Sequence, residues 1–275
     1  MQFVDVKEAL GKGAGDTVNF EKLANISTQG GTLVETSTIP ERNWTSTKGT
    51  LSITEYGNAI PLTRKVDELA EFDIEQIVKT TLRNDMAKVI DSAVYTQFGS
   101  SMIKYCGTTT AAYTVSTNGS MTISNTSSLI GYHIKNIVDY LRGTLLAPPY
   151  DDDGNYVMVG SVTAVRQIYD ALEALNMYTT PTNKLNGEVG RYYDCRVVRE
   201  TNACDSTIGS GNGTGEAFFF GADTVMEAVA VPEELIAKVP TDFGRSKGIA
   251  WYFIGGWKII WSGDPNNRIV HWTSA

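Results

Sequence analysis

The sequence has few of the residues that enzymes most often use for acid–base and nucleophilic chemistry. Its 275 residues include only two histidines, His133 and His271. A serine or cysteine nucleophile is usually activated by a histidine base, and no H-E-x-x-H pair or glycine-lysine-Ser/Thr phosphate loop occurs. We therefore predict no catalytic residue, no cofactor site and no metal site, and we expect that the chain is not an enzyme.

Cysteine is also scarce, and its spacing excludes two common small-domain frameworks. The three residues are Cys106, Cys195 and Cys204. An odd count without a C-x-x-C pair supports neither a disulfide framework nor a zinc site. Reduced thiols are the favoured interpretation, although pairing of Cys195 with Cys204 stays open.

Positive charge is in deficit, and long apolar runs are missing. The chain has 23 Lys and Arg against 31 Asp and Glu, a net charge of −8. The basic residues are scattered, with Arg64-Lys65 as the only adjacent pair, which argues against tight, sequence-specific binding of nucleic acid.

No apolar run approaches the roughly 20 residues of a membrane helix, and the start has no apolar signal region. The acidic run Asp151–Gly154 resembles a calcium loop but lacks the glutamate that closes one, so we interpret it as a solvated turn.

The strongest positive signal is a helical pattern over residues 67–98. Apolar residues recur there at spacings of three and four, which places them on one face of a helix. Acidic residues occupy its first turn and Gly99 follows its end. A single helix on the order of 45 Å long is predicted. Two shorter helices are predicted over 129–145 and 163–176.

Strand patterns dominate both ends of the chain. Residues 1–26 are predicted to form an extended arm, and residues 27–62 a Thr- and Ser-rich β-hairpin with strands over 32–39 and 49–62. Near the C-terminus, short apolar runs predict strands over 217–220, 225–231, 249–254, 257–261 and 269–272, the last two joined by a turn at 264–267. With strands over 156–159 and 195–200, this order indicates an α+β fold whose ends share a sheet.

The hairpin has few apolar residues for its length. An isolated two-stranded hairpin is marginal in water, so either the rest of the chain or another copy must support it. We expect its apolar side chains to lie at contacts between subunits, the alternative for the tryptophan being packing within its own domain. The candidates are Leu33, Val34, Ile39, Trp44, Leu51 and Ile53.

Four short segments resemble a known family. They are Gly15–Val18, Asp91–Tyr95, Gly187–Val198 and Phe218–Gly221. Together they resemble major capsid proteins of tailed bacteriophages, of the N4-like type. The resemblance covers most of the chain as short pieces, and the segment 99–127 has no counterpart in it.

The resemblance implies the HK97-like capsid fold. In its terms, 1–26 is the N-arm, 27–62 the extended hairpin or E-loop, and 67–98 the spine helix. The peripheral domain (P-domain) takes 63–128 and 225–275, with the spine helix and a β-sheet. A mixed α/β axial domain (A-domain) takes 129–224.

The function that follows from the resemblance is structural. The chain would self-assemble, as hexamers and pentamers, into the icosahedral capsid shell that encloses phage double-stranded DNA, with assembly in the host cytoplasm. Expected partners are a separate scaffolding protein, a portal and decoration proteins, with no membrane. The scaffold is expected because only about fifteen residues precede the Gly15–Val18 motif, without a heptad pattern or a run of charge.

Three other functions stay open at this point. An encapsulin-type cellular nanocompartment shell would keep the same fold. A secreted β-rich adhesin or carbohydrate-binding module would suit the Tyr, Trp and Thr content, and a hydrolase would need an acidic site that no motif indicates.

Overall fold

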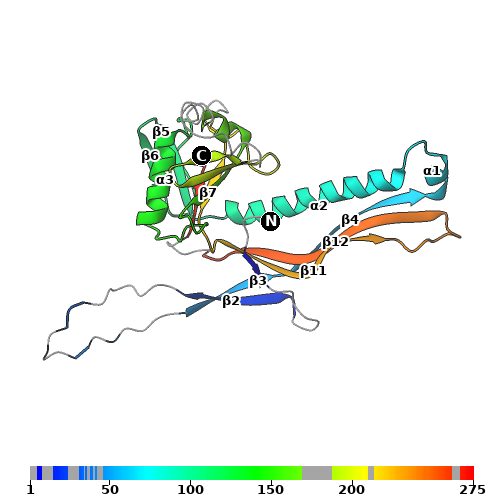
Figure 1. The fold of residues 1–275 in the computed structure, drawn as a ribbon, viewed down its shortest axis with the longest axis horizontal. Coiled ribbons are helices and arrows are strands. Elements are labelled where there is room, and N and C mark those ends of the chain that lie inside the picture. The colour runs from blue at the N-terminus through cyan, green and yellow to red at the C-terminus, as the bar shows by residue number, and fades with distance from the viewer. Residues whose placement is uncertain are drawn as a thin grey trace.

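The computed structural model describes residues 5–7, 15–23, 31–33, 35, 38–39, 41, 46–168, 188–209, 214–261 and 267–275. These residues form two halves, a globular one and an elongated one, that meet at one end of a long helix (Figure 1). The globular half is built on a seven-stranded sheet and α3. The elongated half is built on a four-stranded sheet with α1 and α2. None of the helices described is long and apolar enough to cross a membrane.

The elongated half joins strands from both ends of the chain. Its order is β1-β11-β12-β4, where β1 runs parallel to β11 and the other pairs are antiparallel. The strand bounds are Asp5–Lys7 for β1, Val225–Ala237 for β11, Ser246–Ile259 for β12 and Thr54–Thr63 for β4. The expectation that the chain ends share a sheet is therefore confirmed.

The predicted long helix is present but is broken near its start. Helix α1 spans Arg64–Leu69 and α2 spans Ile74–Gly99, so one continuous helix over 67–98 is wrong. The side chain of Asp73 accepts a hydrogen bond from the Gln76 amide at 3.1 Å and caps α2, and such a cap starts a new helix. The 26 residues of α2 span roughly 39 Å. The predicted apolar face of the helix packs on the sheet, and the buried residues are Val78, Leu82, Ile90, Val94 and Phe98.

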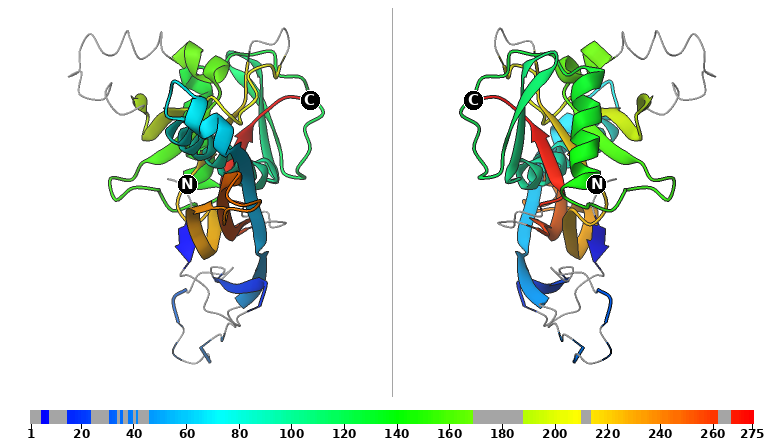
Figure 2. Two further views of the ribbon diagram at one scale, coloured as in Figure 1. Left: turned by 90° about the vertical axis from the view of Figure 1, so that its right-hand side faces the viewer. Right: turned by 90° about the vertical axis from the view of Figure 1, so that its left-hand side faces the viewer.

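The hairpin is paired differently from the prediction. Strand β3, Ser46–Ser52, pairs antiparallel with β2, Thr17–Leu23, across the intervening loop. The described residues of 32–39 are not in a strand, and β4 leaves the hairpin to pair with β12. This pairing sets Phe20 opposite Gly49 and places Phe20 and Leu51 in one buried cluster. This hairpin lies on the opposite side of the four-stranded sheet from α2 (Figures 1 and 2).

The seven-stranded sheet of the globular half is covered on both faces. Its order is β6-β5-β13-β10-β7-β9-β8. The bounds in chain order are Ile103–Thr109 for β5, Ala112–Ser116 for β6, Tyr156–Gly160 for β7, Glu188–Tyr192 for β8, Cys195–Arg199 for β9, Ala217–Phe220 for β10 and Ile269–Trp272 for β13.

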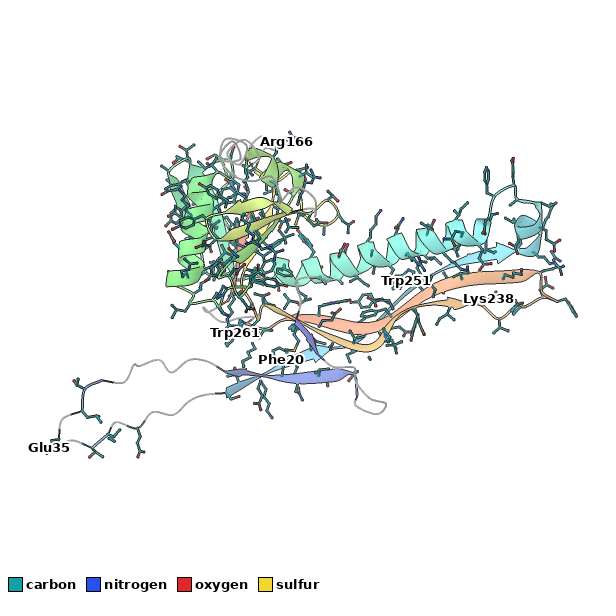
Figure 3. All side chains as sticks on the ribbon, viewed as in Figure 1. Phe20, Glu35, Arg166, Lys238, Trp251 and Trp261 are labelled. Carbon is teal, nitrogen blue, oxygen red and sulfur yellow. The ribbon has the colours of Figure 1, made fainter. Side chains whose placement is uncertain are left out.

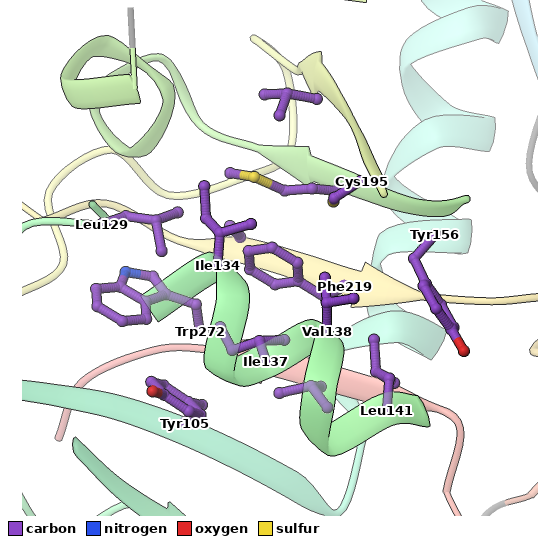
Figure 4. Close-up of a cluster of buried hydrophobic side chains, with 14 of the residues drawn as sticks. Tyr105, Leu129, Ile134, Ile137, Val138, Leu141, Tyr156, Cys195, Phe219 and Trp272 are labelled. Carbon is purple, nitrogen blue, oxygen red and sulfur yellow. The ribbon is translucent and has the colours of Figure 1, made fainter. Parts of the chain in front are cut away.

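The central strand β10 shows how the two faces are filled. Phe219 points into the cluster under α3, Gly131–Gly143 (Figure 4), whereas Phe218 and Phe220 belong to the cluster shared with α2. A strand buried on both faces is a continuous apolar run, which explains the unbroken Ala217–Phe220 segment. The predicted helix over 129–145 is confirmed as α3. Of the predicted helix over 163–176, residues 162–168 are helical and the rest lies outside the described residues.

Two segments join different sheets from those expected. Strands β5 and β6 belong to the seven-stranded sheet, so 103–116 is part of the globular half and not of the elongated one. Strand β13 also joins this sheet, between β5 and β10. The predicted pairing of the last two strands is therefore wrong. The runs 249–254 and 257–261 are mostly one strand, β12, which is already paired on both edges.

Candidate functional site

The six apolar hairpin residues fall into three groups. Leu33 and Ile39 are 61% and 64% exposed, so their side chains are available to a partner. Val34 and Trp44 lie outside the described residues. Leu51 is fully buried in a small core at the base of the hairpin, and Ile53 packs against it. This corrects the expectation for Leu51, because its side chain stabilises the hairpin from within its own chain.

That small core fixes the hairpin to the elongated half. Phe20 and Leu51 from the two strands pack with Ala228 of β11 and with Ile260 and Trp261 after β12. The hairpin therefore has a firm base in its own chain. Glu35, a described residue beyond the two strands, lies far from this base (Figure 3).

A second set of exposed apolar side chains lies at the other end of the elongated half. We define the distal end as residues 64–73 and 236–247, which cover α1 and the β11–β12 turn. These segments lie side by side, because Lys247 Nζ contacts Asp67 Oδ2 at 2.8 Å and the Arg64 amide donates to the Arg245 carbonyl at 2.9 Å. Its exposed large apolar residues are Val66, Leu69, Phe72, Ile236, Val239 and Phe243.

Phe243 is the most unusual residue of the distal end. Its side chain is fully exposed, and its backbone lies in the left-handed region with φ +52°. A bulky residue rarely adopts this conformation. Asp242 has a similar φ of +54°, and Gly244 completes the turn with φ +85°. The turn thus holds an aromatic side chain out into solvent.

The acidic turn of Asp151–Gly154 is neutralised by arginine. Asp151 takes two hydrogen bonds from Arg196, at 3.2 and 3.0 Å, and Asp153 lies 3.7 Å from Arg191. Both carboxylates are thus engaged by strands β8 and β9. In the part of the chain that the structure describes, no group of three or more His, Cys, Asp and Glu side chains could hold a metal ion. The three cysteines are free thiols.

The main buried polar cluster lies where α2 meets the seven-stranded sheet. Lys104 Nζ lies 2.6 Å from Nδ1 of His271, and His271 Nε2 lies 2.5 Å from Oε1 of Glu216. The second oxygen of Glu216 accepts from the Tyr95 hydroxyl at 2.6 Å and from the Asp205 amide at 3.0 Å. Lys104 also donates to the Gly99 carbonyl at 2.9 Å, at the end of α2.

The sheet register brings these residues together. Lys104 of β5 is the direct partner of His271 in β13, which in turn is the partner of Phe218 in β10. Glu216 lies two residues before Phe218 and therefore points to the same face. This face is the one that α2 covers, through Tyr95 and Phe98 against Phe218.

The electrostatics of the cluster favour a neutral imidazole between two charges. Burial lowers the pKa of His271, the hydrogen bond to Glu216 opposes this, and the Lys104 ammonium lowers the pKa again. Burial of Glu216 raises its pKa, but the hydrogen bond and charge interaction with His271, together with hydrogen bonds from Tyr95 and the Asp205 amide, lower it overall. Burial lowers the pKa of Lys104, against the attraction of Glu216.

No motif indicated this cluster, because its members are far apart in the sequence. The other histidine, His133, lies inside α3 as predicted and is fully buried, with Nε2 at 3.1 Å from the Ser127 hydroxyl. Burial also lowers the pKa of His133. No strand was predicted over Ile103–Thr109, so the inward position of Lys104 was not visible from the sequence.

Solved structures of similar fold are capsid proteins of bacteriophages. The capsid protein of Ralstonia phage GP4 is 16% identical, with a TM-score of 0.69 over 99% of this chain and 87% of that chain. That of cyanophage Pam1 is 14% identical, with a TM-score of 0.72 over 99% and 89%. That of Helicobacter pylori bacteriophage KHP30 is 12% identical, with a TM-score of 0.68 over 98% and 87%. No family model and no curated protein matches the sequence.

These similarities establish the fold. The chain has the HK97-like capsid fold over nearly its whole length, in agreement with the expected α+β class.

Proposed function

We propose that this chain is the major capsid protein of a tailed bacteriophage. Its copies assemble into the icosahedral shell that encloses double-stranded DNA, and it is a structural protein without enzymatic activity. The observation that carries the proposal is the shared fold over 98–99% of the chain with capsid proteins of several phages. The short segments that resemble N4-like capsid proteins support that subtype.

The distribution of apolar surface supports self-assembly. Exposed apolar side chains gather at the two extremities of the molecule, Leu33 and Ile39 on the hairpin and Leu69, Phe72 and Phe243 at the distal end. Exposed apolar patches mark sites of protein interaction. An elongated subunit with such patches at its extremities is suited to contacts with several neighbours at once.

The charges of the distal end favour a second copy of this chain as its partner. Whereas the whole chain carries −8, the distal end is balanced, with five basic and five acidic residues. The basic residues are Arg64, Lys65, Lys238, Arg245 and Lys247, and the acidic ones are Asp67, Glu68, Glu71, Asp73 and Asp242. Copies can therefore meet at this end without net repulsion.

The parts of the fold are assigned proposed roles in the shell. Residues 27–62, which include β3, are the E-loop and pack on a neighbouring subunit through the exposed Leu33 and Ile39. Helix α2 is the spine helix of the P-domain, and the globular half is the A-domain, which meets its counterparts in hexamers and pentamers. The N-terminal residues form the N-arm.

Further partners follow from the same proposal. Many copies must close at a defined curvature, which favours a separate scaffolding protein acting during assembly in the host cytoplasm. A portal protein and decoration proteins are the other proposed partners. The net charge of −8 argues against tight, sequence-specific binding to the enclosed DNA.

Electron microscopy of the purified full chain tests the proposal. Expression alone and with the candidate scaffold of the same genome should yield shells, or sheets and tubes built from hexamers and pentamers. Uniform closed particles formed without a scaffold would contradict only the proposal of a separate scaffolding protein. Shells that enclose a co-encoded enzyme would favour the encapsulin alternative, and a chain that stays monomeric by light scattering at high concentration would overturn the proposal.

A further inference from the structure

The Lys104–His271–Glu216–Tyr95 cluster connects the two halves of the subunit. Helix α2 runs along the four-stranded sheet, where Asp85 accepts hydrogen bonds from Trp251 and Asn58, both at 2.9 Å. Only the end of α2 reaches the seven-stranded sheet in Figure 1. Tyr95 and Gly99, the two α2 residues in the cluster, lie at that end.

The arrangement of donors and acceptors fixes the protonation of the cluster. A lysine ammonium has only donors, so Nδ1 of His271 must accept and the ring proton must lie on Nε2. That proton is donated to Glu216. The cluster is thus a cation and an anion bridged by a neutral imidazole, with no net charge, and the side chains of Lys104, His271 and Glu216 are all buried.

A further proton cannot be accommodated in this arrangement. If His271 takes up a proton on Nδ1, an N–H group faces the Lys104 ammonium across 2.6 Å and the hydrogen bond between them is lost. The cluster then carries a net positive charge in a buried place. Unpaired buried charge is strongly unfavourable, so Lys104 must move, together with its contact to the Gly99 carbonyl.

We propose that this cluster is an acid-sensitive latch, in which one proton taken up by His271 separates Lys104 from the imidazole and frees the C-terminal turn of α2 from the seven-stranded sheet. The device belongs to the single subunit and does not depend on what the subunit assembles into. Releasing the latch loosens the joint between the globular and elongated halves.

Among the groups around the cluster, burial and Lys104 together outweigh the opposing effect of Glu216 on the pKa of His271. The ionisable side chains that face the cluster are Tyr95 from α2, Lys104 from β5, Cys204 and Asp205 from the loop after β9, Glu216 before β10 and His271 from β13. Burial and the lysine keep His271 neutral, since both lower its pKa from the ordinary value of 6.5. The latch is therefore closed at neutral pH and opens as the pH falls below that value.

Nuclear magnetic resonance of the unassembled full chain tests the latch directly. The chain has two histidines, so carbon-13 labelling of the imidazoles yields two signals, which His133→Gln or His271→Gln assigns. His271 should titrate below pH 6.5, and the amide signal of Gly99 should change with the same midpoint. Amides of α3, such as that of Asn136, should stay native over this range.

A lysine variant separates the latch from a merely structural role. Lys104→Met removes the ammonium but leaves Glu216 as the charged partner, so His271 should titrate at a higher pH than in the wild type. Lys258→Met, at an exposed position of β12, is the matched control and should change nothing. If Lys104→Met does not fold, the test is whether the titration of His271 and the change in the Gly99 amide signal have the same pH midpoint in the wild-type chain.

Three results would overturn the latch. The first is titration of wild-type His271 at or above pH 6.5. The second is a Gly99 amide that does not follow His271, or that follows only when the α3 amides are lost in the same step. The third is a folded Lys104→Met variant in which His271 titrates no higher than in the wild type.

Discussion

Replacing Phe243 by glycine should weaken assembly and leave the folded monomer almost unchanged. The side chain is fully exposed, so its removal takes no burial from the monomer. At φ +52° a non-glycine residue costs roughly 1 kcal/mol. Glycine avoids that cost, which offsets the roughly 0.5–1 kcal/mol of extra unfolded-state entropy that glycine brings. We therefore expect a monomer stability within about 1 kcal/mol of the wild type.

The effect on assembly should be much larger. If Phe243 is buried against a second copy, the contact gains about 2 kcal/mol from its ring. Losing it should weaken each contact roughly 30-fold, since about 1.4 kcal/mol is a factor of ten. Light scattering against protein concentration measures the threshold for assembly, and circular dichroism on heating measures the monomer.

Asp242→Gly is the matched control for Phe243→Gly. Asp242 lies in the same turn with φ +54° and is exposed, but it has no ring to bury. Its replacement should leave the assembly threshold unchanged. An unchanged threshold for Phe243→Gly would refute the proposed contact. A loss of monomer stability of about 2 kcal/mol or more would show that the ring packs on its own chain.

Three more predictions follow from single residues. Gly49→Leu should destabilise the hairpin by about 2 kcal/mol, measured by urea denaturation. The reason is that even a Cβ atom at this position would lie 2.3 Å from the Phe20 ring. Unchanged stability would contradict the pairing of β2 with β3. Glu227→Gln should stabilise the chain at pH 7, because burial raises the pKa of Glu227 although Trp257 donates to it. A raised carboxyl pKa disfavours folding at pH values above that pKa. The gain in stability from Glu227→Gln should therefore vanish below pH 4.5 in the same denaturation series. An equal gain at pH 7 and below pH 4.5 would exclude titration of Glu227 as its cause. Ile39→Ser should raise the assembly threshold without changing the monomer's melting temperature, and a lower melting temperature would place Ile39 in its own core.

Local patterns predicted those elements whose formation depends mainly on neighbouring residues. The spacing of Ile134, Ile137, Val138 and Leu141 indicated α3, because side chains at three- and four-residue intervals share one face whatever covers it. The aromatic run Ala217–Phe220 likewise indicated a strand. The scarcity of histidine and cysteine argued against an active site.

Strand partners were beyond the reach of local patterns. The sequence of residues 46–52 alone is compatible with pairing to a strand before it or to a strand after it in the chain. The choice of β2 depends on Phe20 fitting over Gly49 and on a core that includes Trp261, more than 200 residues away along the chain. The break before α2 was also missed, because Asp73 serves equally well inside a first turn or as a cap.

Composition and short-range periodicity were enough to predict the fold class, the helical faces and the lack of catalytic motifs. The pairing of the strands, and with it the Lys104–His271–Glu216 cluster, follows from long-range packing in the folded chain. Each of these residues is unremarkable in its own segment. Their chemistry arises because parallel pairing of β5 with β13 and antiparallel pairing of β13 with β10 bring the side chains to one buried face. Because this face is buried, one additional proton on the cluster is energetically costly.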